Sequence, residues 1–367
     1  MPQRKSGHVT LSDVARSAGF AVSTVSIVLS EAPLSKNVSA ATREHIRKTA
    51  ARLGYYPDAF ARSLRKRTSQ TIGVLAFDLS DPFCMPIVGG IQSALQPTGF
   101  LPLVMNAQTQ RKLFDSSLAL MLERRVDGVI VIASWVFEEA GLLTDMRKNK
   151  VPILIVGRDL THQGITSILL DNWQGGYIAM RYLIDLGHRR IAVILGPKEM
   201  FDSQPRWQGI RQAAAEKGLK LDPTLVFQLP GEGGSSAAGF DGGRHFTCEL
   251  LAKGESFSAV LAFDDLTALG VLRALSEAGI RVPDDCSVMG FDDVLPARVC
   301  TPAITTVSQP LHSMGLQAAD GILKALQQSS HRNARLMKLP PELVVRMSTS
   351  ERSPQRELDR SGSPRRV

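Results

Sequence analysis

The sequence predicts an α/β fold, with an all-α helix-turn-helix domain at the N-terminus followed by two doubly wound parallel-sheet lobes. Residues 10–30 have the spacing of two short helices joined at a glycine. After residue 71, short apolar runs alternate with helical stretches. Residues 1–67 hold twelve Lys and Arg against four Asp and Glu, so their net charge of +8 equals that of the whole 367-residue chain. A charge excess confined to one end indicates a polyanion-binding module on a neutral body.

Caps and apolar stripes predict the two helices of residues 10–30. Thr10 can cap the first helix, and Asp13 completes a short variant of the capping box. Gly19 follows where the chain turns sharply, because glycine adopts a left-handed backbone most easily. The second helix is expected over residues 22–30. The side chains expected to face the core are Leu11, Val14, Ala15, Ala18, Val25, Val28 and Leu29.

The outward face of the second helix carries Ser23, Thr24, Ser26 and Ile27. Short hydroxyl side chains suit contacts to phosphates and base edges in the major groove of DNA. A third helix is expected over residues 39–53. The cations that it offers to backbone phosphates are Arg43, Arg47 and Lys48. The plainer alternative is a three-helix bundle with a polar face, but the charge excess on the same module favours DNA binding.

Continuous apolar runs of five or six residues predict buried parallel strands in the body of the chain. They lie at residues 72–77, 101–105, 128–133, 153–157, 191–196, 259–263 and 287–291. Because several such runs alternate with helical stretches over about 270 residues, we expect two lobes with a cleft between them.

Ligands of open α/β sheets bind beyond the carboxyl ends of the strands. This rule alone selects as cleft residues Asp78, Asn106, Trp135, Arg158, Gly196, Asp264 and Asp292. The glycine-rich stretch 231–234, with the sequence GEGG, superficially resembles a phosphate loop but lacks the GK[ST] ending, so a flexible surface loop is expected there.

Several classes of protein are excluded by what the sequence lacks. No secretory signal and no run near the roughly 20 apolar residues that span a bilayer are found, so we expect a cytoplasmic protein without membrane partners. Cys84, Cys248, Cys286 and Cys300 have no CxxC spacing and are expected to be reduced, partly buried thiols. The seven histidines form no metal-binding pair, and no nucleophile and base come together. We therefore expect no metal, no cofactor, no catalytic residue and no enzyme.

At this point the chain resembles the lactose-repressor/galactose-repressor family of bacterial transcriptional regulators. The matching stretches run in one order over residues 9–347. They are TLSDVARSAG, STVSIVL, LGYYPDAFARSLR, TIGVLAFDLSDPF, DNWQGGYIAMRYLIDLGHRRIAVILGP, FDDLTALG, RVPDDCSVMGFDD and TPAITTVSQP. The resemblance implies lobes of the periplasmic-binding-protein type and a repressor whose operator affinity depends allosterically on a small molecule.

The resemblance also implies a hinge helix that enters the minor groove of operator DNA, with Leu64 as the apolar wedge. The residues that it assigns to DNA are Thr10, Val22, Ser23, Thr24, Ser26, Ile27, Tyr56, Arg62 and Leu64. Two positions depart from the family pattern. Ile27 replaces a frequent Arg that reads guanine, and Asp58 replaces the usual Asn. Ile27 can contact only an apolar feature such as a thymine methyl, so an uncommon operator is expected.

For the effector, the resemblance assigns Phe83, Arg206, Asp264 and Asp292 to the cleft. An Arg and an Asp facing one polar ligand supply directional donors and acceptors, and both a sugar and a nucleobase fit them. Asp264 could equally be the N-cap of the following helix. Cys84 replaces a frequent second Phe, which puts ring stacking on that wall in doubt.

The predicted domains are a DNA-binding domain at 9–54, a hinge and linker at 55–68, a two-lobed effector-binding and dimerisation domain at 69–350, and a disordered tail at 351–367. The partners expected are operator DNA, a small-molecule effector and a second copy of the chain. The tail has no leucine heptads, so a tetramer-forming coil is not expected. The main alternative is a solute-binding protein of the periplasmic type, which would share the body but not the charged module.

Overall fold

A computed structural model describes residues 9–30, 32–55, 68–133, 151–231, 236–327 and 334–352. The chain divides into two compact units, Met1–Ser69 and Gln70–Val367. Each unit is described by itself. No helix of the described residues is long and apolar enough to cross a membrane.

The first unit is a small helical domain built from α1 (Leu11–Ala18), α2 (Val22–Leu29) and α3 (Ala40–Leu53), with a short 3-10 helix, η1 (Pro33–Asn37), before α3. The capping box is confirmed, since Thr10 accepts from the backbone N–H of Asp13 and its own N–H donates to the Asp13 carboxylate. Gly19 ends α1 at φ 73°. The buried core is Val14, Ala15, Ala18, Val25, Val28, Ile46 and Ala50. Leu11, Leu29 and Leu53 pack at its edge.

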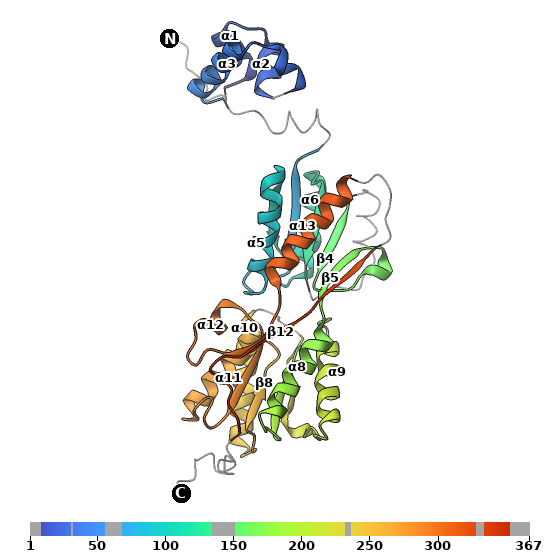
Figure 1. The fold of residues 1–367 in the computed structure, drawn as a ribbon, viewed down its shortest axis with the longest axis vertical. Helices are drawn as coiled ribbons and strands as arrows, with labels where there is room; N and C mark the ends of the chain where they lie inside the picture. The colour runs from blue at the N-terminus through green and yellow to red at the C-terminus, as the bar shows by residue number, and fades with distance from the viewer. Residues whose placement is uncertain are drawn as a thin grey trace. The chain divides into compact units, whose positions relative to one another are not determined.

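The second unit holds two six-stranded sheets (Figure 1). In the first, which we call lobe 1, the strand order is β11-β5-β4-β3-β1-β2, and every pair is parallel. Its strands are β1 (Thr71–Ala76), β2 (Leu101–Asn106), β3 (Gly128–Ile132), β4 (Ile153–Val156), β5 (Thr166–Leu170) and β11 (Leu336–Leu339). Helices α5 (Cys84–Leu95) and α13 (Leu311–Gln327) share a core with one face of the sheet. Helix α6 (Arg111–Glu123) covers the other face.

The second sheet, lobe 2, has the order β12-β10-β9-β8-β6-β7. Its strands are β6 (Ile191–Leu195), β7 (Val226–Gln228), β8 (Ala259–Leu261), β9 (Ser287–Asp292), β10 (Thr305–Ser308) and β12 (Glu342–Val344). Only β12 runs antiparallel to its neighbour. Helices α8 (Asn172–Asp185) and α9 (Ser203–Glu216) cover one face. Helices α10 (Ser236–Ala252) and α11 (Asp265–Glu277) cover the other, and α12 (Leu295–Val299) follows β9.

The chain passes between the lobes three times: after β5, after β10, and between β11 and β12. The last strands of the chain therefore complete the sheets of both lobes. A change in the angle between the lobes has to be absorbed by these three crossings.

All seven predicted strands are confirmed, with ends that differ by one or two residues. The strands β5, β7, β10, β11 and β12 were not predicted. The expectation of cover on both faces is wrong for β2, because it is an edge strand that pairs only with β1 among the described strands, and its Leu101 is 69% exposed.

Candidate DNA-binding and effector sites

The outward face of α2 carries the residues that the sequence assigns to the DNA major groove. Val25 and Val28 are buried in the core of the unit and Leu29 packs at its edge, which leaves the other residues of this eight-residue helix on the outward side. Val22 is 45% exposed, and Ser23 is also exposed. Thr24, Ser26 and Ile27 are half-buried, and Thr10 is exposed. No side chain caps the start of α2, so its first N–H groups can meet an anion.

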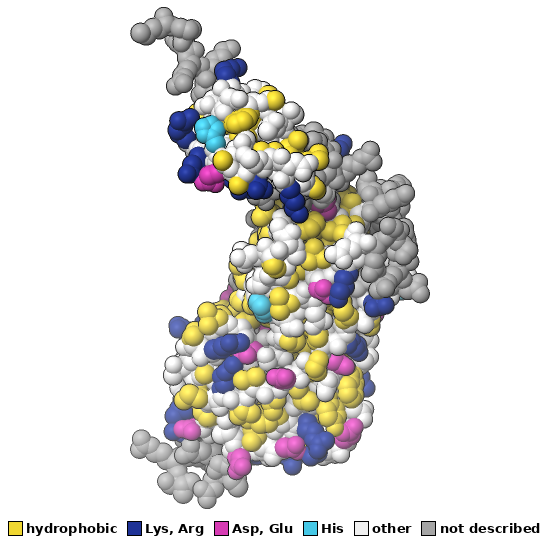
Figure 2. Space-filling view, turned by 45° about the horizontal axis from the view of Figure 1, so that its top comes forward, with side chains coloured by type: hydrophobic (Ala, Val, Ile, Leu, Met, Phe, Trp, Pro, Cys, Tyr) yellow, Lys and Arg dark blue, Asp and Glu magenta, His cyan; other side chains and the backbone are white. Residues whose placement is uncertain are grey.

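The same unit also carries exposed cations, and Figure 2 shows Lys and Arg side chains on its surface in dark blue. The exposed ones are Arg16, Lys36, Arg47, Lys48 and Arg52. The ion pairs of Arg16 with Asp13 and of Lys48 with Glu44 are long, 3.5 Å each, and solvent-exposed. Such pairs are weak, so phosphates can compete for these cations. The hinge residues Tyr56, Arg62 and Leu64 lie outside the described residues.

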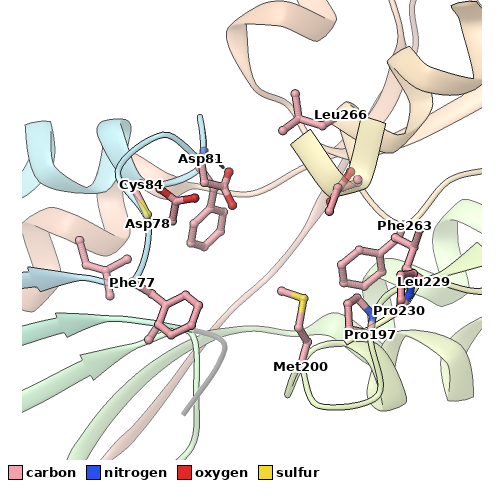
Figure 3. Close-up of a pocket in the computed structure, with 16 residues that line it drawn as sticks. Phe77, Asp78, Asp81, Cys84, Pro197, Met200, Leu229, Pro230, Phe263 and Leu266 are labelled. Carbon is pink, nitrogen blue, oxygen red and sulfur yellow. Dashed lines mark hydrogen bonds between the residues drawn. The ribbon is translucent and has the colours of Figure 1, made fainter. Parts of the chain in front are cut away.

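A hollow of about 810 Å³, part of it open solvent, lies where the carboxyl ends of strands from the two lobes meet. Lobe 1 contributes Phe77, Asp78, Asp81, Phe83 and Cys84, and lobe 2 contributes Pro197, Met200, Phe263, Asp264 and Leu266 (Figure 3). Two of the four predicted effector residues, Phe83 and Asp264, thus line one hollow. The lining combines aromatic rings with carboxylates, which suits a ligand with an apolar face and polar groups.

The wall from lobe 1 is built by hydrogen bonds between near neighbours. Asp78 accepts from the backbone N–H and the hydroxyl of Ser80. Asp81 accepts from the backbone N–H of Phe83 at 3.0 Å and so fixes the start of α5. The pKa of Asp81 is raised to about 6, chiefly by burial and also by the nearby Asp264 and Asp78 carboxylates, against the lowering effect of that hydrogen bond. The sequence prediction missed Asp81, because the strand-end rule selects only the residue directly after a strand.

In lobe 2, Asp264 is the N-cap of a helix and also lines the hollow. Its carboxylate accepts from the backbone N–H of Thr267 at 2.7 Å and caps α11. The same side chain lines the hollow. One carboxylate oxygen can hold the cap while the other faces a ligand.

Arg206 lies behind this wall. It is 5% exposed, and its guanidinium donates to Asn172 Oδ1 at 3.2 and 2.7 Å and to the carbonyl of Phe263. Its Cζ stands 4.4 Å from the ring centroid of Phe263 and 3.5 Å from that of Phe291. Because Phe263 lines the hollow and Arg206 does not, the ring separates the guanidinium from the space for a ligand.

Asp292 ends β9, also outside the lining of the hollow. Its carboxylate accepts from Gln309 Nε2 at 2.5 Å. Burial raises its pKa well above the ordinary value, the charge of Arg206 lowers it, and Asp264, Asp265 and Asp81 raise it again. The predicted Arg206 and Asp292 therefore lie behind the lining of the hollow and are not part of it.

The other strand-end candidates have local structural contacts. Asn106 accepts from the backbone N–H groups of Leu79 and Gln108, at 3.1 and 3.0 Å. The Gly196 carbonyl accepts from the Ser203 hydroxyl. Arg158 is half-buried at the end of β4. Trp135 and glycines 233 and 234 lie outside the described residues.

The described residues offer neither a metal-binding cluster nor a disulfide. No group of three His, Cys, Asp or Glu there could hold a metal ion. Cys84 and Cys286 are buried and Cys300 is half-buried. The expectation of a partly buried thiol is wrong for Cys248, which is exposed on α10.

Comparisons with known proteins cover both units. Residues 10–58 match the model of bacterial regulatory proteins of the lacI family, and residues 180–349 match a periplasmic binding protein-like domain. The HTH-type transcriptional repressor PurR of Vibrio parahaemolyticus is 31% identical over 337 residues, which is 92% of this chain and 97% of that protein. The HTH-type transcriptional regulator GalR of Escherichia coli is 33% identical over 312 residues, which is 85% of this chain and 87% of that protein.

Two solved structures are similar over both units. A lac repressor dimer bound to operator and the anti-inducer ONPF has a TM-score of 0.79 and 28% identity, and the match covers 94% of this chain and 100% of that one. The complex of the transcriptional regulator CelR with cellobiose has a TM-score of 0.67 and 29% identity, and the match covers 93% of this chain and 100% of that one.

Proposed function

The chain belongs to the lacI family of bacterial regulatory proteins, and from this premise we propose that it is a transcriptional repressor whose affinity for operator DNA depends on a small molecule bound between its lobes. The observation that carries this function is that one chain holds a cationic helix-turn-helix unit and a two-lobed body with a hollow at its strand ends. A periplasmic solute-binding protein would need only the second. Because the curated relatives are regulators, we propose no catalysis, and because operator DNA is the partner, we place the protein in the cytoplasm.

We assign base and phosphate contacts to the outward face of α2 and to the hinge that follows α3. The assigned residues are Thr10, Val22, Ser23, Thr24, Ser26, Ile27, Tyr56, Arg62 and Leu64. Ile27 has no hydrogen-bonding group, so it favours a thymine methyl where an Arg would read guanine. Leu64 is the wedge that opens the minor groove in this proposal.

For the effector, we assign direct contact to Phe83 and Asp264, which line the hollow. Arg206 reaches a ligand only if the Phe263 ring moves aside, and Asp292 then supplies the matching acceptor. Carboxylates, a guanidinium and aromatic rings suit a neutral polar ligand such as a sugar or a nucleobase.

Ligand binding would control DNA by changing the angle between the lobes. The three crossings transmit that change, and a coupling free energy of about 1–3 kcal/mol is typical of such linkage. By analogy with the lac repressor dimer on its operator, we propose that this chain acts as a homodimer. The domains proposed are a DNA-binding domain at 9–54, a hinge at 55–68, an effector-binding domain at 69–350 and a tail at 351–367.

The function is tested by selecting operators for the full-length chain from a random duplex library. We expect one preferred sequence, bound with an affinity that falls steeply as salt rises, because phosphate contacts release counterions. Ile27→Arg should shift the selected base toward guanine at one position of each half-site. The matched control is Leu34→Arg, which adds the same charge at a side chain that is 60% exposed in η1, and it should strengthen binding without changing the selected sequence.

The regulatory half is tested on that operator with cellobiose, ribose, galactose and guanine as probes. A probe that raises the melting temperature of the protein should also change its operator affinity several-fold. A chain that selects no sequence and ignores duplex DNA in dilute buffer would contradict the proposal.

A further inference from the structure

The turn that follows β9 has an unusual backbone. Asp292 and Asp293 have φ values of 109° and 61°, and neither is glycine. Residues with a Cβ are strained in this region, so the conformation persists only where the surroundings hold it. The strained pair includes Asp292, the carboxylate proposed above to meet the effector when the Phe263 ring moves aside.

The carboxylate of Asp293 is held from two sides. Arg346 donates to Oδ1 through Nη2. Arg298 donates to Oδ1 through Nε at 3.2 Å and to Oδ2 through Nη2 at 2.9 Å. The same Nη2 of Arg298 donates to the carbonyl of Asp293 at 3.1 Å. The Asp293 side chain is only 8% exposed, so these charge-assisted hydrogen bonds are shielded from water.

Arg346 is itself anchored. Its Nη1 donates to the carbonyl of Ile304 at 2.9 Å, and its backbone N–H donates to the Thr305 hydroxyl at 3.0 Å. It stands two residues after β12, in lobe 2, beyond the crossing that joins β11 to β12. Its side chain is 17% exposed, whereas that of Arg298 is 55% exposed, so Arg346 is the stiffer of the two partners.

We propose that Asp293, clamped by Arg346 and Arg298, is a positioning residue that holds the left-handed turn and thereby aims the Asp292 carboxylate at the effector without touching the effector itself. The proposal rests on the function proposed above, in which Asp292 meets the ligand. Its rival is a purely structural staple that ties α12 and β12 to β9. A staple would stabilise the fold but would leave the environment of Asp292 unchanged.

Two substitutions at one position separate these roles. Asp293→Ala and Asp293→Gly both remove the clamp, but only glycine adopts φ near 61° without strain. The readout is the titration of the Asp292 carboxyl carbon by nuclear magnetic resonance on the full-length, ¹³C-aspartate-labelled chain. The resonance is assigned through its loss in Asp292→Asn. Asp284→Ala, which removes a 3.3 Å exposed ion pair with Arg281, is the control.

We expect the Asp292 carboxyl group to titrate at lower pH in Asp293→Ala, because the turn relaxes and the carboxylate gains water. In Asp293→Gly and Asp284→Ala it should titrate as in the unmodified chain. Arg346→Met, which keeps the strain and removes the stiffer clamp, should behave like Asp293→Ala and serves if that variant does not fold. Equal titration of Asp292 in the alanine and glycine variants would overturn the proposal.

Affinity gives a second, separable readout, with cellobiose, ribose, galactose and guanine as probes. A probe that binds the unmodified chain should bind Asp293→Ala about tenfold more weakly than Asp293→Gly, the ratio expected if alanine costs about 1–2 kcal/mol more in this conformation. Equal affinities would count against positioning. If none of the four probes binds the unmodified chain, the effector class proposed above is rejected, and the carboxyl titration still decides the role of Asp293.

Discussion

The two lobes have the same strand order, yet they build their walls of the cleft in different ways. In lobe 1, Asp78 and Asp81 bond to residues two positions further along the chain. In lobe 2, Arg206 bonds to Asn172 and to the Phe263 carbonyl, which are 34 and 57 positions away in the sequence. The wall of lobe 2 is therefore part of its core, whereas the wall of lobe 1 is a set of local turns. Substitutions in lobe 2 should disturb the fold, and those in lobe 1 should mainly change the cleft.

The largest expected effect is that of Arg206→Ala. It leaves the side-chain Oδ1 of Asn172 and the backbone carbonyl of Phe263 without their donor and removes the charge that lowers the pKa of Asp292. Loss of one partner in such a buried network costs about 3–5 kcal/mol. Urea denaturation should show this loss in the free energy of unfolding. The control Arg211→Ala removes an exposed arginine of the same helix and should change stability by less than about 0.5 kcal/mol. Equal losses of unfolding free energy in Arg206→Ala and Arg211→Ala would contradict the inference that the wall of lobe 2 is part of its core.

The sequence predicts the first unit better than the cleft, because its signals are local. Thr10, Asp13 and Gly19 define α1 and its turn through contacts within a few residues. The strands that the sequence did not predict depend instead on contacts between residues far apart in the chain. Leu336 of β11 pairs with Ser167 of β5, and such a partner 169 positions away cannot be read from a short, partly polar run.

The cleft shows the same limit at the level of single side chains. Asp264 follows from the strand-end rule and the family motifs, Phe83 follows from the family motifs alone, and both line the hollow. The position of the Phe263 ring over the Arg206 guanidinium does not follow from strand ends or family motifs. A Cβ at Gly196 would lie 2.3 Å from the Phe263 ring, so the absence of a side chain there lets the ring take its place over the guanidinium. Sequence spacing selects the residues of a site, but packing decides which of them face the ligand.

The second prediction concerns a buried histidine that only lobe 2 has among the described residues. His188 is 3% exposed, with Nδ1 at 2.9 Å from the Ser258 hydroxyl and Nε2 at 3.2 Å from the Ser350 carbonyl. Burial lowers its pKa from 6.5 to about 4, although the Ser350 carbonyl favours the charged form. Between pH 6.5 and 4 the unfolded chain binds a proton at His188 more readily than the folded chain does. The contribution of the neutral, buried His188 to the free energy of unfolding is therefore present above pH 6.5 and is lost as the pH falls to 4.

Comparison of the unmodified chain with His188→Gln measures that contribution. The difference in free energy of unfolding should shrink by about 3 kcal/mol between pH 7 and pH 4. His162→Gln, at an exposed position in lobe 1, should show no such trend. If the difference in free energy of unfolding between the two chains does not depend on pH, His188 is protonated equally in the folded and unfolded states. Loss of stability in acid would then not distinguish lobe 2 from lobe 1.

The smallest expected effect is a gain of stability from the wall of lobe 1. The pKa of Asp81 is raised to about 6, so its charged form is disfavoured above that pH, and the penalty disappears as the pH falls toward the ordinary value of 3.8. Asp81→Asn keeps an oxygen for the Phe83 N–H and removes the charge that faces Asp78 and Asp264. It should therefore stabilise the chain by about 1 kcal/mol at pH 8 and by nothing at pH 3.5. Asp159→Asn is the matched control, because Asp159 accepts from the N–H of Thr161 in the same kind of turn outside the hollow. If urea denaturation shows that both variants are equally stable at pH 8, the carboxylates do not repel across the cleft. Asp81 would then be an ordinary turn residue, and its charge would have no effect on stability through the facing residues of lobe 2.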